Sequence, residues 1–112
     1  MHSLATKKCV PCEGGIPPLD ATRIQEYLKD IHGEWRYVAG PPDSIERVFA
    51  CKNFAEALKF VNNVGRVAEE EQHHPDIDIR YNKVRIVLST HAIGWLSEND
   101  FILAAKIDTL RS

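Results

Sequence analysis

The sequence predicts a single α+β domain in which four antiparallel strands form one sheet and three helices pack on one of its faces. Two observations lead to this class. Helix and strand signals follow one another in the order α-β-β-α-β-β-α, and the strands of each pair are only a few residues apart, as antiparallel hairpins require. The length of 112 residues allows one hydrophobic core and is too short for two.

The composition is that of a globular protein without a membrane or nucleic-acid partner. Hydrophobic residues make up 44% and charged residues 27% of the chain, and no apolar run approaches the roughly 18 residues that a membrane span requires. The formal net charge is −2 and the 14 basic residues are scattered, whereas nucleic-acid binding normally uses a basic stripe with interleaved aromatic residues. Because the start, MHSLATKK, lacks the apolar stretch of a secretory signal, we expect a cytoplasmic protein.

The first nineteen residues are predicted to form an irregular arm that precedes a domain of residues 20–112. Proline and glycine are dense there and no periodicity is visible. Cys9 and Cys12 form a C-x-x-C pair, which is redox-active in some proteins and half of a zinc site in others. A second ligand pair is missing, and an odd count of three cysteines without an export signal favours reduced thiols. We therefore expect the arm to be inert or to contact another subunit.

The first half of the domain is predicted to hold a helix and a hairpin. Asp20 is a good N-cap, an apolar stripe follows at helical spacing, and Gly33 is a natural stop. The stripe consists of Ile24, Tyr27, Leu28 and Ile31. The stretches WRYVAG and IERVFACK then flank a PPDS turn, as the two strands of a hairpin do.

The second half begins with a longer helix. Asn53 can cap it, with Glu56 in the reciprocal position. It should end before Pro75, because proline disfavours helix in the residue that precedes it. The side chains that recur at helical spacing, and are therefore predicted to face the core, are Phe54, Ala57, Leu58, Val61, Val64 and Ala68.

A second hairpin and a last helix complete the domain. Ile77, Ile79 and Tyr81 alternate with polar residues in a half-buried strand, Asn82-Lys83 is the predicted turn, and VRIVLSTH is the returning strand.

Ser97 then opens the last helix, with Asp100 at the capping-box position. The side chains of this helix that are predicted to be buried are Phe101, Ile102, Ala105 and Ile107.

The stretch QHHPDIDIRYNKVRIVLSTH, which begins at Gln72, holds three histidines whose role needs an explanation. A metal site is one reading. Helical metal pairs stand at i and i+4, however, whereas the neighbours His73 and His74 would diverge by about 100° in a helix. No second Cys or His lies at ligand spacing nearby, and we predict no metal.

Two other readings stay open from the residues alone. His73 would simply end a helix, where the macrodipole and Glu69, four residues earlier, favour a cation. Alternatively, His73 and His91 would form an acid–base site. In a strand, His91 shares a face with Ser89 and points away from the core side of Leu88. A hairpin can bring this strand end back beside the preceding helix end, so the two histidines would converge on one pocket.

EEEQHHPDIDIRYNKVRIVLSTH, together with the downstream LSEND, resembles the signature of the pterin-4a-carbinolamine dehydratase family. In that family a glutamate precedes HHP by four residues, and a YNKV-type turn leads into a strand that ends in Thr-His. A Leu-Ser/Thr helix cap then leads to an aspartate. All these features stand at matching spacing over residues 69–100, and a weaker resemblance, which includes VFACKNF, covers most of the chain beyond the arm.

The resemblance implies both an assembly and a reaction. Family members are α+β domains that assemble as homodimers or homotetramers. They convert 4a-hydroxytetrahydropterin to quinonoid dihydropterin and water, which recycles the tetrahydrobiopterin used by aromatic amino acid hydroxylases. No metal and no organic cofactor are implied, because the pterin is the substrate.

Carried over residue by residue, the resemblance assigns catalysis to His73, His74 and His91. His73 and His91 would be the general acid and base, in either order, and His74 would hold the pterin. Glu69 would orient the histidines or tune their charge. The other residues that the resemblance places around the pterin are Trp35, Gln72, Ser89, Thr90, Ala92 and Asp100. For Asp100, the capping-box position is already a sufficient explanation.

Three positions depart from the family pattern. Gln72 stands where the animal enzymes carry aspartate, Ile77 replaces an aromatic residue, and Trp95 stands where glycine is common. Because of these departures the shape of the pterin pocket is not predicted. They do not affect the assignment of the three histidines. The alternative function is a non-catalytic pterin-binding, dimerisation or coactivator/assembly module of the same fold. Such a relative would be expected to lose a histidine, and this chain keeps all three.

Overall fold

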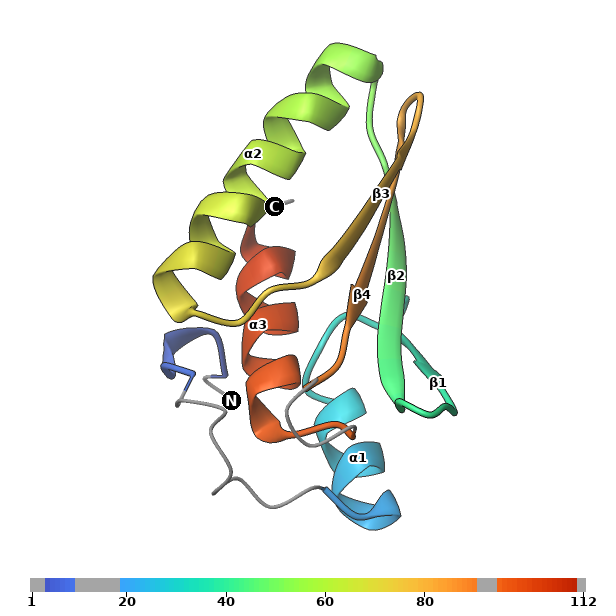
Figure 1. Cartoon of the computed structure of the whole chain (residues 1–112), viewed down its shortest axis with the longest axis vertical. Helices are drawn as coiled ribbons and strands as arrows, with labels where there is room; N and C mark the ends of the chain where they lie inside the picture. Colours follow the sequence, from blue (N-terminus) through green and yellow to red (C-terminus); the bar gives the residue numbers. More distant parts are fainter. Residues whose placement is uncertain (1–3, 10–18, 91–94, 111–112) are drawn as a thin grey trace.

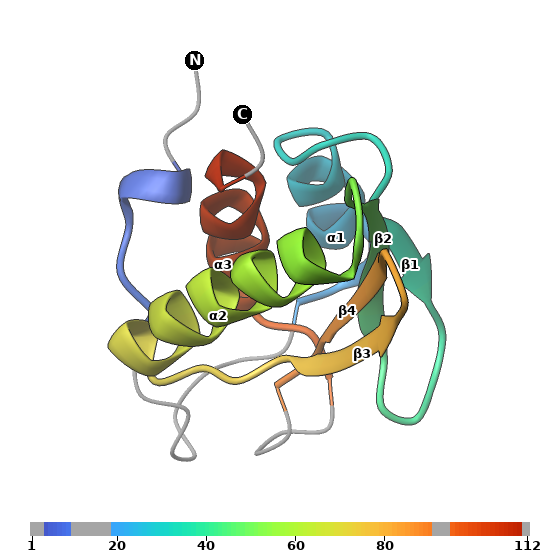
Figure 2. The same ribbon diagram turned by 90° about the horizontal axis from the view of Figure 1, so that it is seen from above.

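The computed structural model describes residues 4–9, 19–90 and 95–110, which form one four-stranded sheet with the helices on one side (Figures 1 and 2). The helices are η1 (Leu4–Thr6, a single 3-10 turn), α1 (Ala21–Leu28), α2 (Phe54–Glu71) and α3 (Glu98–Thr109). The strands are β1 (Arg36–Val38), β2 (Ser44–Ala50), β3 (Asp76–Arg80) and β4 (Lys83–Leu88). The predicted α+β class and its element order are confirmed. In these described ranges no helix has both the length and the apolar character needed to cross a membrane.

The strands run antiparallel in the order β1-β2-β4-β3, so β2 and β4 form the centre of the sheet. Their alternate side chains face the helices and are almost completely buried. These side chains are Ile45, Phe49, Val84, Ile86 and Leu88. The other face carries Val48, which is exposed, and a 2.8 Å ion pair between Glu46 and Arg85. The two-residue alternation of each strand therefore separates an apolar face from a polar one, as the sequence predicts.

α3 is the central helix of the covered face, with η1 and α2 packed against it (Figure 2). Its first two turns are buried almost all round, through Asn99, Asp100, Phe101, Ile102, Leu103 and Ala104, and Ile107 is buried in the third turn. The polar residues buried in these turns, Asn99 and Asp100, must find partners inside the protein. The polar side chains at both ends of α3 therefore organise their surroundings.

α1 ends at Leu28, earlier than the stop predicted at Gly33. The amides of Lys29 and Asp30 bond to carbonyls three residues back, at 3.2 and 2.9 Å, which tightens and closes the last turn. The amide of His32 then bonds to a carboxylate of α3, so a tertiary contact draws the chain away from the helix axis.

The buried stripe of α2 differs in part from the prediction. Phe54 and Leu58, predicted to face the core, are exposed. The buried residues are Ala57, Phe60, Val64 and Ala68. These four follow one another at spacings of three and four, so they lie on one narrow face, and Phe54 and Leu58 lie at its margin.

The turn between β3 and β4 lies one residue earlier than predicted. Arg80 pairs with Lys83, so the turn residues are Tyr81 and Asn82. Tyr81, predicted on the buried face, is 67% exposed and has φ of 53°, a conformation that costs a non-glycine residue about 1 kcal/mol or more. Asn82 explains the shift, because its side-chain amide donates to Cys51 O at 2.9 Å and its carbonyl accepts from Cys51 N at 2.7 Å.

The C-terminal end of α3 is tied to the sheet by Asp108. Its Oδ1 accepts from Trp35 Nε1 at 2.8 Å and from Arg47 Nη1 at 2.7 Å, and its Oδ2 accepts from His32 N at 3.1 Å. Arg47 and Asp108 are both largely buried, and the guanidinium lies 4.2 Å from the centre of the Phe49 ring. Loss of this carboxylate would leave a buried cation without its anion.

We predict that Asp108→Ala lowers the free energy of unfolding by about 3 kcal/mol, because removing one member of a buried ion pair leaves the other charge uncompensated. Urea denaturation followed by circular dichroism measures the change. Asp78→Ala, which removes the exposed 3.5 Å pair with Arg80, is the control and should cost less than about 1 kcal/mol. Equal costs for the two variants would show that Asp108 does not anchor the helix.

Candidate functional site

The chain leaves α2 through a turn that carries His73 into the interior. Gln72 has the left-handed conformation, with φ 55° and ψ 39°. His73 N donates to Ala68 O at 3.2 Å and Gln72 N donates to Glu69 O at 3.3 Å. This pair of bonds is a Schellman motif, which closes a helix and reverses the direction of the chain. As a result the side chain of His73 is 5% exposed, whereas that of its neighbour His74 is 56% exposed.

The imidazole of His73 meets a fully buried carboxylate in the first turn of α3. Nε2 of His73 lies 2.7 Å from Oδ1 of Asp100, whose exposure is 0%. Oδ2 of Asp100 accepts hydrogen bonds from Thr90 Oγ1 at 2.8 Å and from Ser97 N at 2.9 Å. In the tautomer of His73 that carries its hydrogen on Nε2, the ring donates this contact to the carboxylate. Groups from three separate segments thus converge on one buried anion.

Asp100 is a helix cap and a histidine partner at the same time. Ser97 and Asp100 form the capping box that the sequence predicts. Each carboxylate oxygen has its own partner. Oδ2 accepts a hydrogen bond from the N-cap amide of Ser97, and Oδ1 contacts His73. Thr90 Oγ1 also lies 2.7 Å from Ser97 Oγ. The cap, the end of β4 and the histidine therefore belong to one hydrogen-bonded network.

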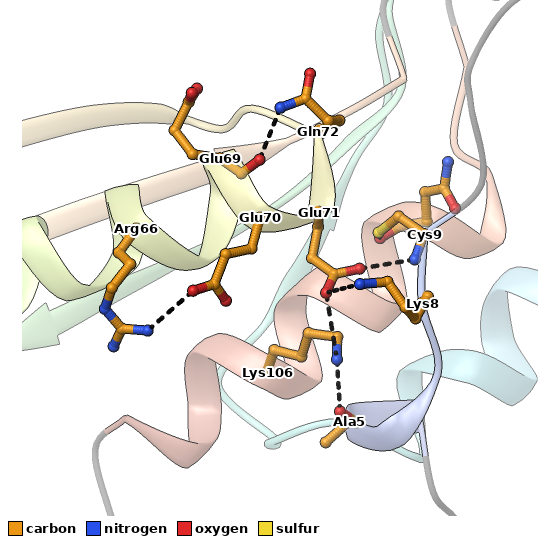
Figure 3. A network of polar contacts seen from close by, with 10 residues as sticks. Ala5, Lys8, Cys9, Arg66, Glu69, Glu70, Glu71, Gln72 and Lys106 are labelled. Atoms are coloured by element: carbon orange, nitrogen blue, oxygen red, sulfur yellow. Dashed lines mark hydrogen bonds and ion pairs between the residues drawn. The ribbon is translucent and has the colours of Figure 1, made fainter.

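A second histidine–carboxylate pair lies on the surface of the same turn. Nε2 of His74 is 2.5 Å from Oε2 of Glu69, and both side chains are exposed. Gln72 Nε2 donates to Glu69 O at 2.7 Å across the turn (Figure 3). An exposed pair contributes at most about 1 kcal/mol to stability, so the consequence of this contact is the orientation of the His74 ring. Glu69 thus contacts His74 and not His73.

The end of β4 brings Ser89 and Thr90 beside the buried network. Both residues are buried, and Thr90 N donates to Trp95 O at 3.0 Å in an isolated bridge between those residues. His91 and Ala92, predicted as a catalytic residue and a pterin contact, lie outside the described residues. The described chain therefore leads to His91 from a residue that itself bonds to Asp100.

Trp35 does not join this cluster within the described structure. It is buried, its Nε1 bonds to Asp108, and its ring meets Phe49 edge-on with centroids 6.1 Å apart. Asp108 follows Asp100 by eight residues on α3, which corresponds to about 12 Å along a helix axis. Trp35 thus packs at the end of α3 opposite to His73.

Sequence reasoning missed what the Thr90 side chain does. The residue was predicted only to lie around the pterin, and its hydroxyl donates to Asp100. The signal was present in the strand alternation, which places Thr90 on the core side with Leu88.

The two adjacent histidines contact different carboxylates, His73 that of Asp100 and His74 that of Glu69. Within residues 4–9, 19–90 and 95–110, no group of three or more His, Cys, Asp or Glu side chains is arranged to hold a metal ion.

Comparison with known proteins finds relatives along almost the whole chain. The family model described as pterin 4 alpha carbinolamine dehydratase matches residues 17–110. A protein of Alkaliphilus metalliredigens is 46% identical over 112 residues, which are 100% of this chain and 99% of that protein. A protein of Nitrosospira multiformis is 49% identical over 110 residues, which are 98% of this chain and 94% of that protein. Both carry the provisional name pterin-4-alpha-carbinolamine dehydratase.

Two solved structures share the fold. A transcriptional coactivator/pterin dehydratase from Brucella melitensis superposes with a TM-score of 0.79 and 29% identity, over 86% of this chain and 100% of that chain. A pterin dehydratase-like protein identified as a RuBisCO assembly factor in the alpha-carboxysome gives a TM-score of 0.60 and 28% identity, over 70% of this chain and 90% of that chain.

We predict that Asp100→Asn lowers the free energy of unfolding by about 2 to 4 kcal/mol. It weakens a buried charge-assisted hydrogen bond, and its NH2 group must face either the Ser97 and Thr90 donors or the His73 ring. Chemical denaturation measures the loss. Asp76→Asn, at an exposed position at the start of β3, is the control and should change stability by less than about 0.5 kcal/mol. If Asp100→Asn left the free energy of unfolding unchanged, the carboxylate would not organise the site.

Proposed function

This chain belongs to the pterin 4 alpha carbinolamine dehydratase family, and from that premise we propose that it removes water from 4a-hydroxytetrahydropterin to give quinonoid dihydropterin. The observation that carries the proposal is the buried contact between His73 and Asp100. Thr90, the residue before His91 in the sequence, donates to the same carboxylate.

The reaction needs two proton transfers and no redox change. The bond between C4a and the hydroxyl oxygen breaks, its electron pair leaves with the oxygen, and a proton delivered to that oxygen releases water. The proton on N5 is removed, and its electron pair forms the new double bond between N5 and C4a. One acid and one base are therefore required, and histidine is suited to both roles near neutral pH.

We assign these two proton transfers to His73 and His91, without ordering them. Asp100 supports the assignment for His73, since a buried carboxylate fixes the ring orientation and stabilises the imidazolium formed when the ring accepts a proton. The assignment of His91 comes from the family pattern and from its place directly after Thr90.

The exposed side of the turn suits the recognition of a flat, polar ring. We propose that His74, oriented by Glu69, holds the pterin, and that Gln72 and the chain end Ser89-Thr90-His91-Ala92 contribute further contacts. The assignment of Trp35 to the pterin pocket stays a prediction, because Trp35 packs at the other end of α3.

No metal or organic cofactor is part of the proposal, because the pterin is the substrate. The substrate class ties the protein to an aromatic amino acid hydroxylase or another enzyme that leaves a 4a-hydroxylated tetrahydropterin. Assembly as a homodimer or homotetramer stays a prediction.

The second candidate is a binding or assembly role without turnover. It is favoured by the names of two structural relatives, one a transcriptional coactivator/pterin dehydratase and the other a RuBisCO assembly factor. Both candidate functions are compatible with this fold, so a measurement of turnover is needed to distinguish them.

We predict that the protein accelerates dehydration of enzymatically generated 4a-hydroxytetrahydropterin over the spontaneous reaction. His73→Ala and His91→Ala should each lower kcat/KM by about 10² to 10⁴, the usual contribution of positioned acid–base groups. His74→Ala should act mainly through KM, because it removes a binding contact. Stopped-flow absorbance measures all three.

His32→Ala is the matched control, since His32 is an exposed histidine near the opposite end of α3, and it should retain the wild-type rate. A folded wild type that gives no acceleration would exclude the dehydratase and favour the binding role.

A further inference from the structure

The described part of the N-terminal arm, residues 4–9, is packed against the end of α2 and the start of α3. Leu4 is 2% exposed and belongs to the hydrophobic core, and η1 lies against α3. At the other end of the segment, the Cys9 thiol donates to Asn99 O at 3.6 Å. Lys7 and Glu98 form a 2.7 Å ion pair over the same helix start. The arm segment is therefore part of the packed structure, although the sequence predicts an inert or subunit-contacting arm.

Glu71, the last residue of α2, binds this arm segment through a hydrogen bond and ion pairs (Figure 3). Its side chain is 6% exposed, and Oε1 accepts from Cys9 N at 2.8 Å. Oε2 lies 3.6 Å from Lys106 Nζ on α3 and 3.9 Å from Lys8 Nζ. Lys106 in turn donates to Ala5 O at 2.8 Å. One buried carboxylate thus joins α2, α3 and the arm.

The surroundings of Glu71 favour its charged form. Burial alone would raise its pKa, but the hydrogen bond from Cys9 N and the positive charges of Lys106 and Lys8 outweigh burial. The pKa of Glu71 therefore lies below its ordinary value of 4.5. The 2.8 Å hydrogen bond from Cys9 N to the ionised carboxylate is charge-assisted.

The arm segment is anchored immediately beside both members of the buried pair. Glu71 precedes His73 by two residues, and Asn99 directly precedes Asp100. A segment held at Glu71 and at Asn99 resists any separation of the end of α2 from the start of α3. Such a separation would lengthen the 2.7 Å contact between His73 and Asp100.

We propose that Glu71 is a positioning residue, which locks the arm across the two helix ends and thereby holds His73 against Asp100. The expected effect on turnover rests on the proposed dehydratase function. The expected effect on the His73 ring does not depend on that function. The positioning role of Glu71 and the dehydratase function can therefore fail separately.

Glu71→Gln and Leu4→Ala test the proposal from opposite sides of the contact. Glu71→Gln removes the charge that binds Lys106, while Leu4→Ala removes the apolar anchor of the arm in the core and leaves that charge in place. Glu70→Gln is the matched control, because Glu70 is an exposed neighbour paired with Arg66 at 3.5 Å. Circular dichroism establishes that each variant is folded at the temperature of measurement.

The first readout is the proton NMR signal of His73 Nε2–H and its exchange with water. Both Glu71→Gln and Leu4→Ala should move this signal and speed its exchange, and Glu70→Gln should leave it unchanged. Leu4→Ala excludes a purely electrostatic effect of Glu71 on the ring, since the charge is kept. A signal unchanged in folded Glu71→Gln would overturn the proposal, whatever the protein catalyses.

The second readout is the kinetics of 4a-hydroxytetrahydropterin dehydration. Glu71→Gln should lower kcat by about 10-fold to 100-fold with KM unchanged, since a misplacement of roughly 1 Å costs on the order of 10² in rate. In a His73→Ala background the same change should have no further effect. A loss that persists in that background would assign Glu71 a role independent of His73. If the wild type gives no turnover, the NMR signal alone decides the proposal.

The stability that Glu71 contributes should depend on pH in a defined direction. A carboxyl group whose pKa is lowered by folding stabilises the protein above its ordinary pKa, and this contribution is lost as the pH falls through the lowered value. The difference in denaturation midpoint between wild type and Glu71→Gln should therefore be constant near pH 7 and shrink below pH 4.5. Midpoints of urea unfolding between pH 3 and pH 7 test this, and a difference independent of pH would contradict the ionised contact.

Discussion

The burial of the Asp100 carboxylate is the constraint on which the rest of the site depends. An anion with 0% exposure is tolerated only where donors satisfy its oxygens. Asp100 obtains them from His73, Thr90 and Ser97, which belong to three separate segments of the chain. The end of α2, the end of β4 and the start of α3 must therefore meet at one point, and this requirement fixes the position of the catalytic candidate His73.

α3 carries an aspartate near each end, and the two have different consequences. Asp108 is directed at the sheet and holds Arg47 and Trp35, so it fixes how the helix lies on β2. Asp100 is directed at the turn after α2 and holds a histidine. Between them Phe101, Ile102, Leu103, Ala104 and Ile107 are buried, so a shift at one end of the helix would be transmitted to the other through close packing. The position of α3 on the sheet and the geometry of the site therefore depend on the same helix.

Local signals were enough to predict the elements, but not the contacts between them. The caps at Asp20 and Asn53 were predicted correctly because capping depends on a few neighbouring residues. The turn at Tyr81-Asn82 was misplaced because its register depends on hydrogen bonds to Cys51, which is distant in sequence.

The same limit applies at the site. Spacing along the chain identified His73, and the strand pattern made a meeting with the next hairpin plausible. It could not show that Asp100 acts as both cap and partner, nor that Glu71 receives the arm. Both facts depend on which helix ends are adjacent in space, and that is a property of the packed domain.

The buried pair is itself an argument for chemistry. Replacing a buried polar pair by apolar side chains of similar volume is often neutral or stabilising, so such a pair is weak evidence for a role in stability. The capping box explains Ser97 and one oxygen of Asp100, since a serine N-cap needs only the reciprocal acceptor. It does not explain why an imidazole, with 5% of its side chain exposed, occupies the space against the other oxygen. A buried imidazole held by a buried carboxylate is an arrangement that can position an acid–base group. This contact is therefore an observation that supports the proposed proton transfer by His73.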